Sequence, residues 1–174
     1  MRNLAIRQAL VEIARRDVGK VEVTRNRAPW IQKYWDATTL PNGHTDRQPY
    51  CAAAVAWWVR EWLKLPEVLA AMKMNAVGAS ERWRCKSARA FDWLDWAQKR
   101  GLEVLSDRPT ERLRVGDIMV FDISHIAVVK DDDASGVYTI ESNTGNGSIR
   151  DGDGCFERVR QRSQARAFIR LIEP

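Results

Sequence analysis

Four side chains that could together form a nucleophile, a base and an orienting group lie in three separate segments of this sequence: Cys51, His125, Glu141 and Asn143. A cysteine thiolate can attack a carbonyl carbon, and an imidazole with a near-neutral pKa can move the proton. A carboxylate or an amide beside the imidazole can fix its tautomer and stabilise the imidazolium. A free cysteine alone is more often a small buried hydrophobe. All four residue types, in this order and on the elements described below, predict nucleophilic catalysis by a cysteine with a base and an orienting group.

The cysteine stands at the predicted start of an apolar helix, 51–64, just after a loop that contains Pro, Asn and Gly. A helix N-terminus presents free backbone N–H groups and the positive end of the helix dipole. A thiol placed there loses its proton more easily, and an oxyanion beside it finds hydrogen-bond donors. Gln48 and Tyr50, which lie within the three residues before the cysteine, are predicted to assist in binding the substrate.

The histidine is the first residue of a predicted strand, after a β-prone run, 117–121, and a short turn. The other histidine of the chain, His44, lies in the Pro-Asn-Gly loop and is expected to be solvated. Along the next predicted strand, 137–143, the alternation of side chains places Glu141 and Asn143 on one face. The residues alone leave open which of these two orients the imidazole.

The chain has three cysteines, and Cys85 and Cys155 do not form a paired spacing with Cys51. An odd number of cysteines without paired spacing argues against a disulfide framework and favours folding in a reducing cytoplasm. Cys85 directly precedes a predicted helix, 86–101, and has basic neighbours, so it is a weaker alternative nucleophile. The chain has no CxxC pair and no histidine cluster, and neither a metal nor a cofactor is expected.

The hydrophobic pattern is helical in the first part of the chain and alternating in the second. We predict helices over 4–18, 30–35, 51–64, 67–76 and 86–101 and strands over 118–121, 126–130, 137–141, 156–159 and 168–172. This order predicts an α+β fold in which N-terminal helices, about 1–101, pack on an antiparallel sheet, about 102–174. A chain of 174 residues with 45% hydrophobic content is expected to form one domain.

The net charge of +5 favours an anionic partner. Basic and acidic residues are mixed along the chain, and the dense basic run 158–162 is interpreted as a solvated strand face, so nucleic acid is not expected as a partner. Arg7 and Gln8 interrupt the apolar residues near the N-terminus, which predicts synthesis in the cytoplasm without a signal peptide. No apolar stretch is long enough for membrane insertion.

Three motifs resemble the CHAP family of cysteine, histidine-dependent amidohydrolases and peptidases, which are related to NlpC-type and papain-like cysteine peptidases. They are Pro-Tyr-Cys-Ala-Ala followed by Trp-Trp, Val-Gly-Asp-Ile-Met-Val-Phe ahead of the histidine, and Ile-Glu-Ser-Asn-Thr-Gly. The resemblance covers about the whole chain, with Tyr50 standing where many close relatives have tryptophan. It implies a papain-like single domain with Cys51 as nucleophile, His125 as base, and Glu141 with Asn143 as orienting residues. It also favours Glu141 as the direct partner of the histidine.

The resemblance further implies a peptidoglycan hydrolase that cuts a stem peptide or a cross-bridge through a cysteine thioester. Such a protein would reach the cell wall as a phage endolysin released through a holin, or as an antibacterial amidase delivered by secretion machinery and countered by an immunity protein. An alternative, suggested by the eight tryptophans, is a non-catalytic cell-wall-binding or virion structural protein with the same fold. Which amide bond is cut stays open.

Overall fold

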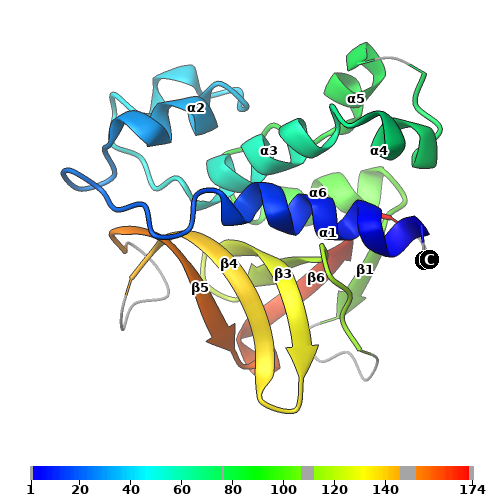
Figure 1. Cartoon of the computed structure of the whole chain (residues 1–174). Helices are drawn as coiled ribbons and strands as arrows, with labels where there is room; N and C mark the ends of the chain where they lie inside the picture. Colours follow the sequence, from blue (N-terminus) through cyan, green and yellow to red (C-terminus); the bar gives the residue numbers. More distant parts are fainter. Residues whose placement is uncertain (1, 76, 107–111, 146–151, 173–174) are drawn as a thin grey trace.

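The computed structural model describes residues 2–75, 77–106, 112–145 and 152–172, and it places a layer of helices over an antiparallel sheet (Figure 1). The helices are α1 (Arg2–Arg15), η1 (Pro29–Ile31), α2 (Gln32–Trp35), η2 (Pro41–Gly43), α3 (Cys51–Trp62), α4 (Pro66–Ala71), α5 (Val77–Trp83), α6 (Asp92–Lys99) and η3 (Arg162–Gln164). The strands are β1 (Glu103–Ser106), β2 (Ile118–Phe121), β3 (Ile126–Asp133), β4 (Gly136–Thr144), β5 (Gly154–Arg160) and β6 (Ala165–Arg170). The predicted α+β class is confirmed.

The six strands lie in the order β1-β6-β2-β3-β4-β5, and every neighbouring pair is antiparallel. All four residues of β2 are buried, as expected for a strand covered on both faces. The β3–β4 hairpin brings the start of β3 beside the end of β4. Residues 125 and 141, separated by most of the hairpin in sequence, therefore become neighbours.

The helix α3 is the buried centre of the helical layer and contacts α1, α2, β3 and β4. Its alanines are fully buried and, having the smallest side chains after glycine, allow the sheet to approach closely. Trp62 Nε1 donates to the carbonyl oxygen of Ile6 at 2.8 Å, and Trp58 Nε1 donates to Asp17 Oδ2 at 2.9 Å. Packing and hydrogen bonds therefore fix the position of the α3 N-terminus.

The helix predicted over 86–101 is shorter in the structure, because it begins only at Asp92. The Ser87 hydroxyl donates to Asp92 Oδ2 at 2.5 Å and accepts the backbone N–H of Arg89 at 3.1 Å. Such local side-chain bonds compete with helical backbone bonds, so residues 86–91 form a turn instead. Two elements, α5 and β1, were absent from the prediction, and the predicted helix 67–76 ends at Ala71, with residue 76 outside the described residues.

Candidate active site

The structure brings Cys51, His125 and Glu141 together. Cys51 is the first residue of α3, His125 directly precedes β3, and Glu141 lies on β4. His125 Nε2 lies 3.0 Å from Glu141 Oε2, and both side chains are fully buried. Because an ionised carboxylate can only accept, Nε2 donates in this bond. The imidazole is therefore held by Glu141 through one nitrogen, with the other left for the thiol.

The second imidazole nitrogen, Nδ1, has no hydrogen-bond partner among the described residues. The Cys51 thiol is near enough to the ring to raise its pKa, although it is not in hydrogen-bonding geometry with Nδ1. Hydrogen bonds of this kind are often long before substrate binds. The arrangement therefore provides a nucleophile, a proton carrier and an orienting carboxylate in the required order.

The protein environment raises the pKa of His125 and lowers the pKa of Glu141 relative to their usual values. Burial alone lowers the pKa of His125, but the nearby Cys51 thiol and the hydrogen bond and charge of Glu141 outweigh it and raise the pKa to about 9. Burial raises the pKa of Glu141, but Arg160 and then His125 outweigh it and lower the pKa to about 2. At neutral pH the histidine is therefore an imidazolium and the glutamate a carboxylate.

Arg160 on β5 is a residue of this site that the sequence prediction missed. Its Nε donates to Glu141 Oε1 at 2.7 Å and its Nη2 donates to Glu141 Oε2 at 2.7 Å. The interpretation of 158–162 as a solvated face is therefore wrong for Arg160, whose side chain is only 12% exposed. Arg160 pairs opposite Val137, and its long side chain reaches along β4 to the carboxylate. This contact depends on strand register, which the sequence pattern did not provide.

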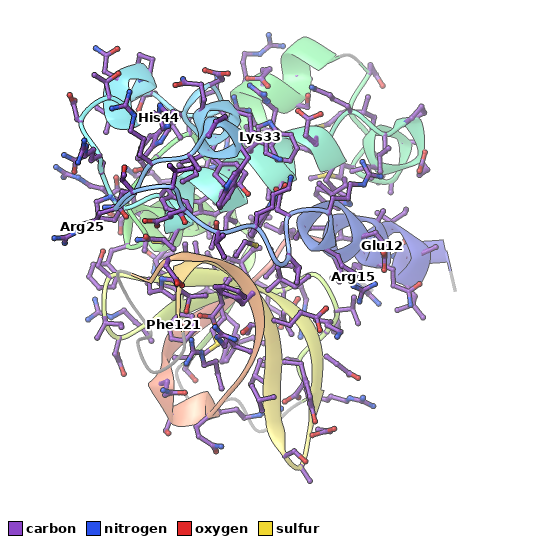
Figure 2. All side chains as sticks on the ribbon, turned by 60° about the vertical axis from the view of Figure 1, so that its left-hand side comes forward. Glu12, Arg15, Arg25, Lys33, His44 and Phe121 are labelled. Atoms are coloured by element: carbon purple, nitrogen blue, oxygen red, sulfur yellow. The ribbon has the colours of Figure 1, made fainter. Side chains whose placement is uncertain are left out.

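Glu141 also accepts the Thr139 hydroxyl at Oε1, at 2.6 Å. With the imidazole and the two guanidinium nitrogens, its two oxygens accept hydrogen bonds from four donor atoms. The Phe121 ring packs against the His125 imidazole, with the ring centroids 5.0 Å apart, and lies among the strands (Figure 2).

The other histidine, His44, lies in the helical layer (Figure 2). His44 was expected to be solvated, but it is half-buried and its Nε2 lies 3.1 Å from the carbonyl oxygen of Ala28.

Asn143 is buried near the end of β4 but does not share the imidazole with Glu141. The β4–β5 register shifts between Ser142 and Thr144, and Asn143 has a left-handed backbone with φ of 59°. Both side-chain amide atoms lack a hydrogen-bond partner among the described residues. The bulge interrupts the alternation on which the prediction of a common face with Glu141 was based. Of the two residues that the sequence left open, Glu141 makes the hydrogen bond to His125.

The two predicted substrate-binding residues differ. Gln48 is exposed and lines the same pocket as Cys51. The Tyr50 ring is fully buried, stacks on Tyr34 at 6.1 Å between centroids, and meets the edge of Trp30 at 5.8 Å. The structure therefore contradicts a substrate contact for the Tyr50 side chain, which instead packs against Tyr34 and Trp30 just before α3. Burial also raises the pKa of its hydroxyl far above the usual range.

The structure does not favour Cys85 as a nucleophile. It lies in the turn after α5 rather than at a helix start, and its side chain is buried. Burial raises the pKa of its thiol to about 11, despite the neighbouring Arg84. Neither histidine is among the residues that surround it in its own surface groove. The thiol is therefore held in its protonated, unreactive form.

The pocket that contains Cys51 has a volume of about 230 Å³. One wall is formed by Trp35 and Leu40, a second by Gln48 and Pro49, a third by residues 88–90, and Ser124 of the turn before His125 completes it. Cys51 as a residue is 5% exposed. The pocket is thus large enough for one substituted amide group against the sulfur.

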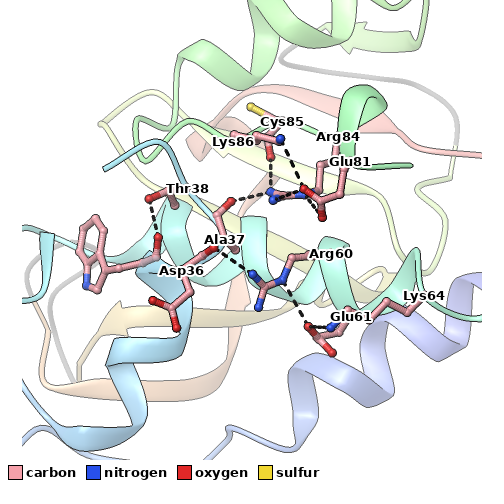
Figure 3. A network of polar contacts seen from close by, with 11 residues as sticks. Asp36, Ala37, Thr38, Arg60, Glu61, Lys64, Glu81, Arg84, Cys85 and Lys86 are labelled. Atoms are coloured by element: carbon pink, nitrogen blue, oxygen red, sulfur yellow. Dashed lines mark hydrogen bonds and ion pairs between the residues drawn. The ribbon is translucent and has the colours of Figure 1, made fainter. Parts of the chain in front are cut away.

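Hydrogen bonds connect the segments that supply the pocket walls, and Figure 3 shows the part of this network around Arg60 and Arg84. Arg84 Nη1 donates to the carbonyl oxygen of Ala37, and Arg60 Nη1 donates to that of Asp36 at 2.9 Å. The backbone N–H of Thr39 donates to the carbonyl oxygen of Lys86 at 3.0 Å. The loop after α2 is therefore tied both to α3 and to the segment that precedes α6.

No group of three or more His, Cys, Asp or Glu side chains suited to a metal ion occurs within the described residues. In the same part of the chain, no helix combines the length and apolarity needed to cross a membrane.

Comparison with known proteins identifies one family. The model of the CHAP domain matches residues 41–143, a segment that includes Cys51, His125, Glu141 and Asn143. No curated protein and no solved structure matches the chain. CHAP domains are typically hydrolases, namely cysteine amidases or peptidases, whose activity in general is directed at peptidoglycan. Because the match spans more than half of the sequence and includes all four candidate residues, the chain belongs to the CHAP domain family.

Proposed function

We propose that this protein hydrolyses an amide bond of a peptidoglycan stem peptide or cross-bridge through a thioester on Cys51. The observation that carries the proposal is the buried His125–Glu141 hydrogen bond beside a cysteine at the start of α3. A fixed imidazolium beside a thiol at a helix N-terminus is the environment that activates cysteine nucleophiles.

In the first half of the reaction, the Cys51 thiolate attacks the amide carbonyl carbon and a C–S bond forms. The resulting oxyanion accepts hydrogen bonds from the free N–H groups of the first turn of α3, with Gln48 at the same pocket wall. The C–N bond then breaks, and the amine leaves with the proton of the His125 imidazolium. A thioester and a neutral imidazole remain.

In the second half, the neutral His125 takes a proton from water, and the hydroxide attacks the thioester carbonyl. The C–S bond breaks, which releases a carboxylic acid and restores the thiolate–imidazolium pair. Glu141 keeps the ring in the required orientation throughout and stabilises its positive charge. Asn143 contributes through the position of the β4 bulge rather than through a bond to the imidazole.

Two biological settings suit such an enzyme, a phage endolysin and a delivered antibacterial amidase. In both it acts at the bacterial cell wall, after release through a holin or transport by secretion machinery. The second setting adds an immunity protein as a partner. The alternative is a non-catalytic wall-binding or virion protein, and its main support was the number of tryptophans. This support is weaker because four of the eight tryptophans are fully buried in the core: Trp35, Trp58, Trp62 and Trp93.

The test is digestion of purified peptidoglycan by the wild type, by C51A and by the matched cysteine variant C85A. We expect the wild type and C85A to release amines and C51A to release none, with all three folded by circular dichroism. Fragment masses then identify the bond, because a new L-alanine amine marks cleavage at the sugar lactyl group and any other new amine marks an endopeptidase. Undiminished digestion by C51A would refute the mechanism.

A further inference from the structure

The pocket around Cys51 carries one formal positive charge on its wall. Among the described residues that line it, Arg89 is the one whose side chain is permanently charged, and the others are apolar or neutral apart from the Cys51 thiol itself. Arg89 lies in the turn that precedes α6, on the segment 88–90. Arg89 therefore lines the same pocket as the sulfur that an amide substrate would approach.

The backbone of Arg89 is fixed, whereas its guanidinium is not used by the fold. Its N–H donates to Ser87 Oγ at 3.1 Å, and the next residue, Ala90, is fully buried. The Arg89 side chain is exposed, and its guanidinium makes no hydrogen bond or ion pair with another described residue. Arg84 and Arg160, by contrast, have their guanidinium groups bonded within the protein.

We propose that Arg89 binds a carboxylate of the substrate, so that the pocket selects peptides with a free carboxylate next to the amide that is cut. This inference rests on the proposed function and specifies its substrate class. The planar guanidinium matches a carboxylate with two parallel hydrogen bonds. A carboxamide in the same place has nearly the same shape but no charge, and its NH₂ group cannot accept. The enzyme therefore distinguishes acidic wall peptides from their amidated forms.

The test uses two synthetic peptides that contain the bond identified by the fragment masses. One has a free carboxylate on the residue next to this bond, and the other has the carboxamide. For the wild type we expect kcat/KM about tenfold higher with the carboxylate peptide, which is the scale of one charge-assisted hydrogen-bonded pair at a solvated site. R89Q should lose this preference by slowing the carboxylate peptide alone, and R89K should retain part of it.

The matched control is R16Q, which removes one exposed positive charge outside this pocket and should preserve the wild-type ratio. Equal cleavage of both peptides by the wild type would overturn the inference while leaving the proposed function intact. An equal slowing of both peptides by R89Q would also overturn it, because a general effect on the fold or on positioning does not depend on the substrate charge. If the wild type cleaves neither peptide nor whole peptidoglycan, the proposed function fails and the inference fails with it.

Discussion

The ion pair between Arg160 and Glu141 makes a sharp prediction about stability. Glu141 is fully buried, and Arg160 donates to both of its oxygens. The substitution R160M retains an unbranched chain but removes both donors and the charge. The carboxylate then remains in the interior with Thr139 and His125 as its partners.

The expected magnitude follows from the pKa of Glu141. A carboxyl group whose pKa falls from 4.5 to about 2 on folding contributes about 3 kcal/mol to the free energy of unfolding at pH 7, since each tenfold change in acidity corresponds to about 1.4 kcal/mol. After burial, which acts in the opposite direction, Arg160 is the largest influence on this pKa. We therefore expect R160M to lower the free energy of unfolding by about 2–3 kcal/mol.

The sign of the pH dependence follows as well. Because folding lowers this pKa, its stabilising contribution is complete above about pH 4.5 and disappears as the pH falls through about 2. The difference between wild type and R160M should therefore be largest near pH 7 and smaller at pH 3.

Urea denaturation at pH 7 and pH 3 measures this difference. K130M is the matched control, since Lys130 makes an ion pair with Glu157 in which both side chains are at least 30% exposed. Exposed pairs contribute about 1 kcal/mol or less. If R160M costs no more than K130M at pH 7, the claim that Arg160 stabilises the buried carboxylate is refuted.

Three further predictions concern the site and its walls. The rate of hydrolysis should fall above about pH 9, where His125 loses the proton that it gives to the leaving amine; a rate unchanged to about pH 10.5 would contradict this. C85S should change kcat/KM by less than about twofold, since that thiol is buried and protonated, and a loss above about tenfold would contradict this. G43A places a Cβ 2.2 Å from the fully buried Trp35 ring, so we expect about 1–3 kcal/mol of destabilisation by thermal denaturation and a higher KM; an unchanged melting temperature would contradict this.

The sequence predicted the parts of the fold that have strong local signals. Alternation and an apolar helical run located β2 and the start of α3, and these elements place Cys51 and His125. The motif Ile-Glu-Ser-Asn contains Glu141, which makes the hydrogen bond to His125, but the alternation argument for Asn143 was wrong because a bulge occurs there. The segment 86–91 has helical periodicity, but hydrogen bonds of the Ser87 side chain compete with helical backbone bonds there, so the helix begins only at Asp92.

Other features depend on contacts between distant segments and have no local signal. The role of Arg160 requires knowledge of the register between β4 and β5, which period-two patterns do not fix in a strand with mixed polarity. The burial of Tyr50 requires the positions of Tyr34 and Trp30, which belong to α2 and η1. Sequence reasoning therefore selected side chains that lie together in the structure, but it did not find the residues that support them.

The most direct test of the central claim is a burst experiment with an activated ester of a cell-wall peptide, such as a p-nitrophenyl ester. With such a substrate, formation of the acyl-enzyme is faster than its hydrolysis, so the intermediate accumulates. We predict a burst of about one nitrophenol per protein molecule, with the acyl group mapped to Cys51 by mass spectrometry and absent in C51A. An acyl group on Cys85, or a burst that persists in C51A, would contradict the assignment of Cys51 as the nucleophile.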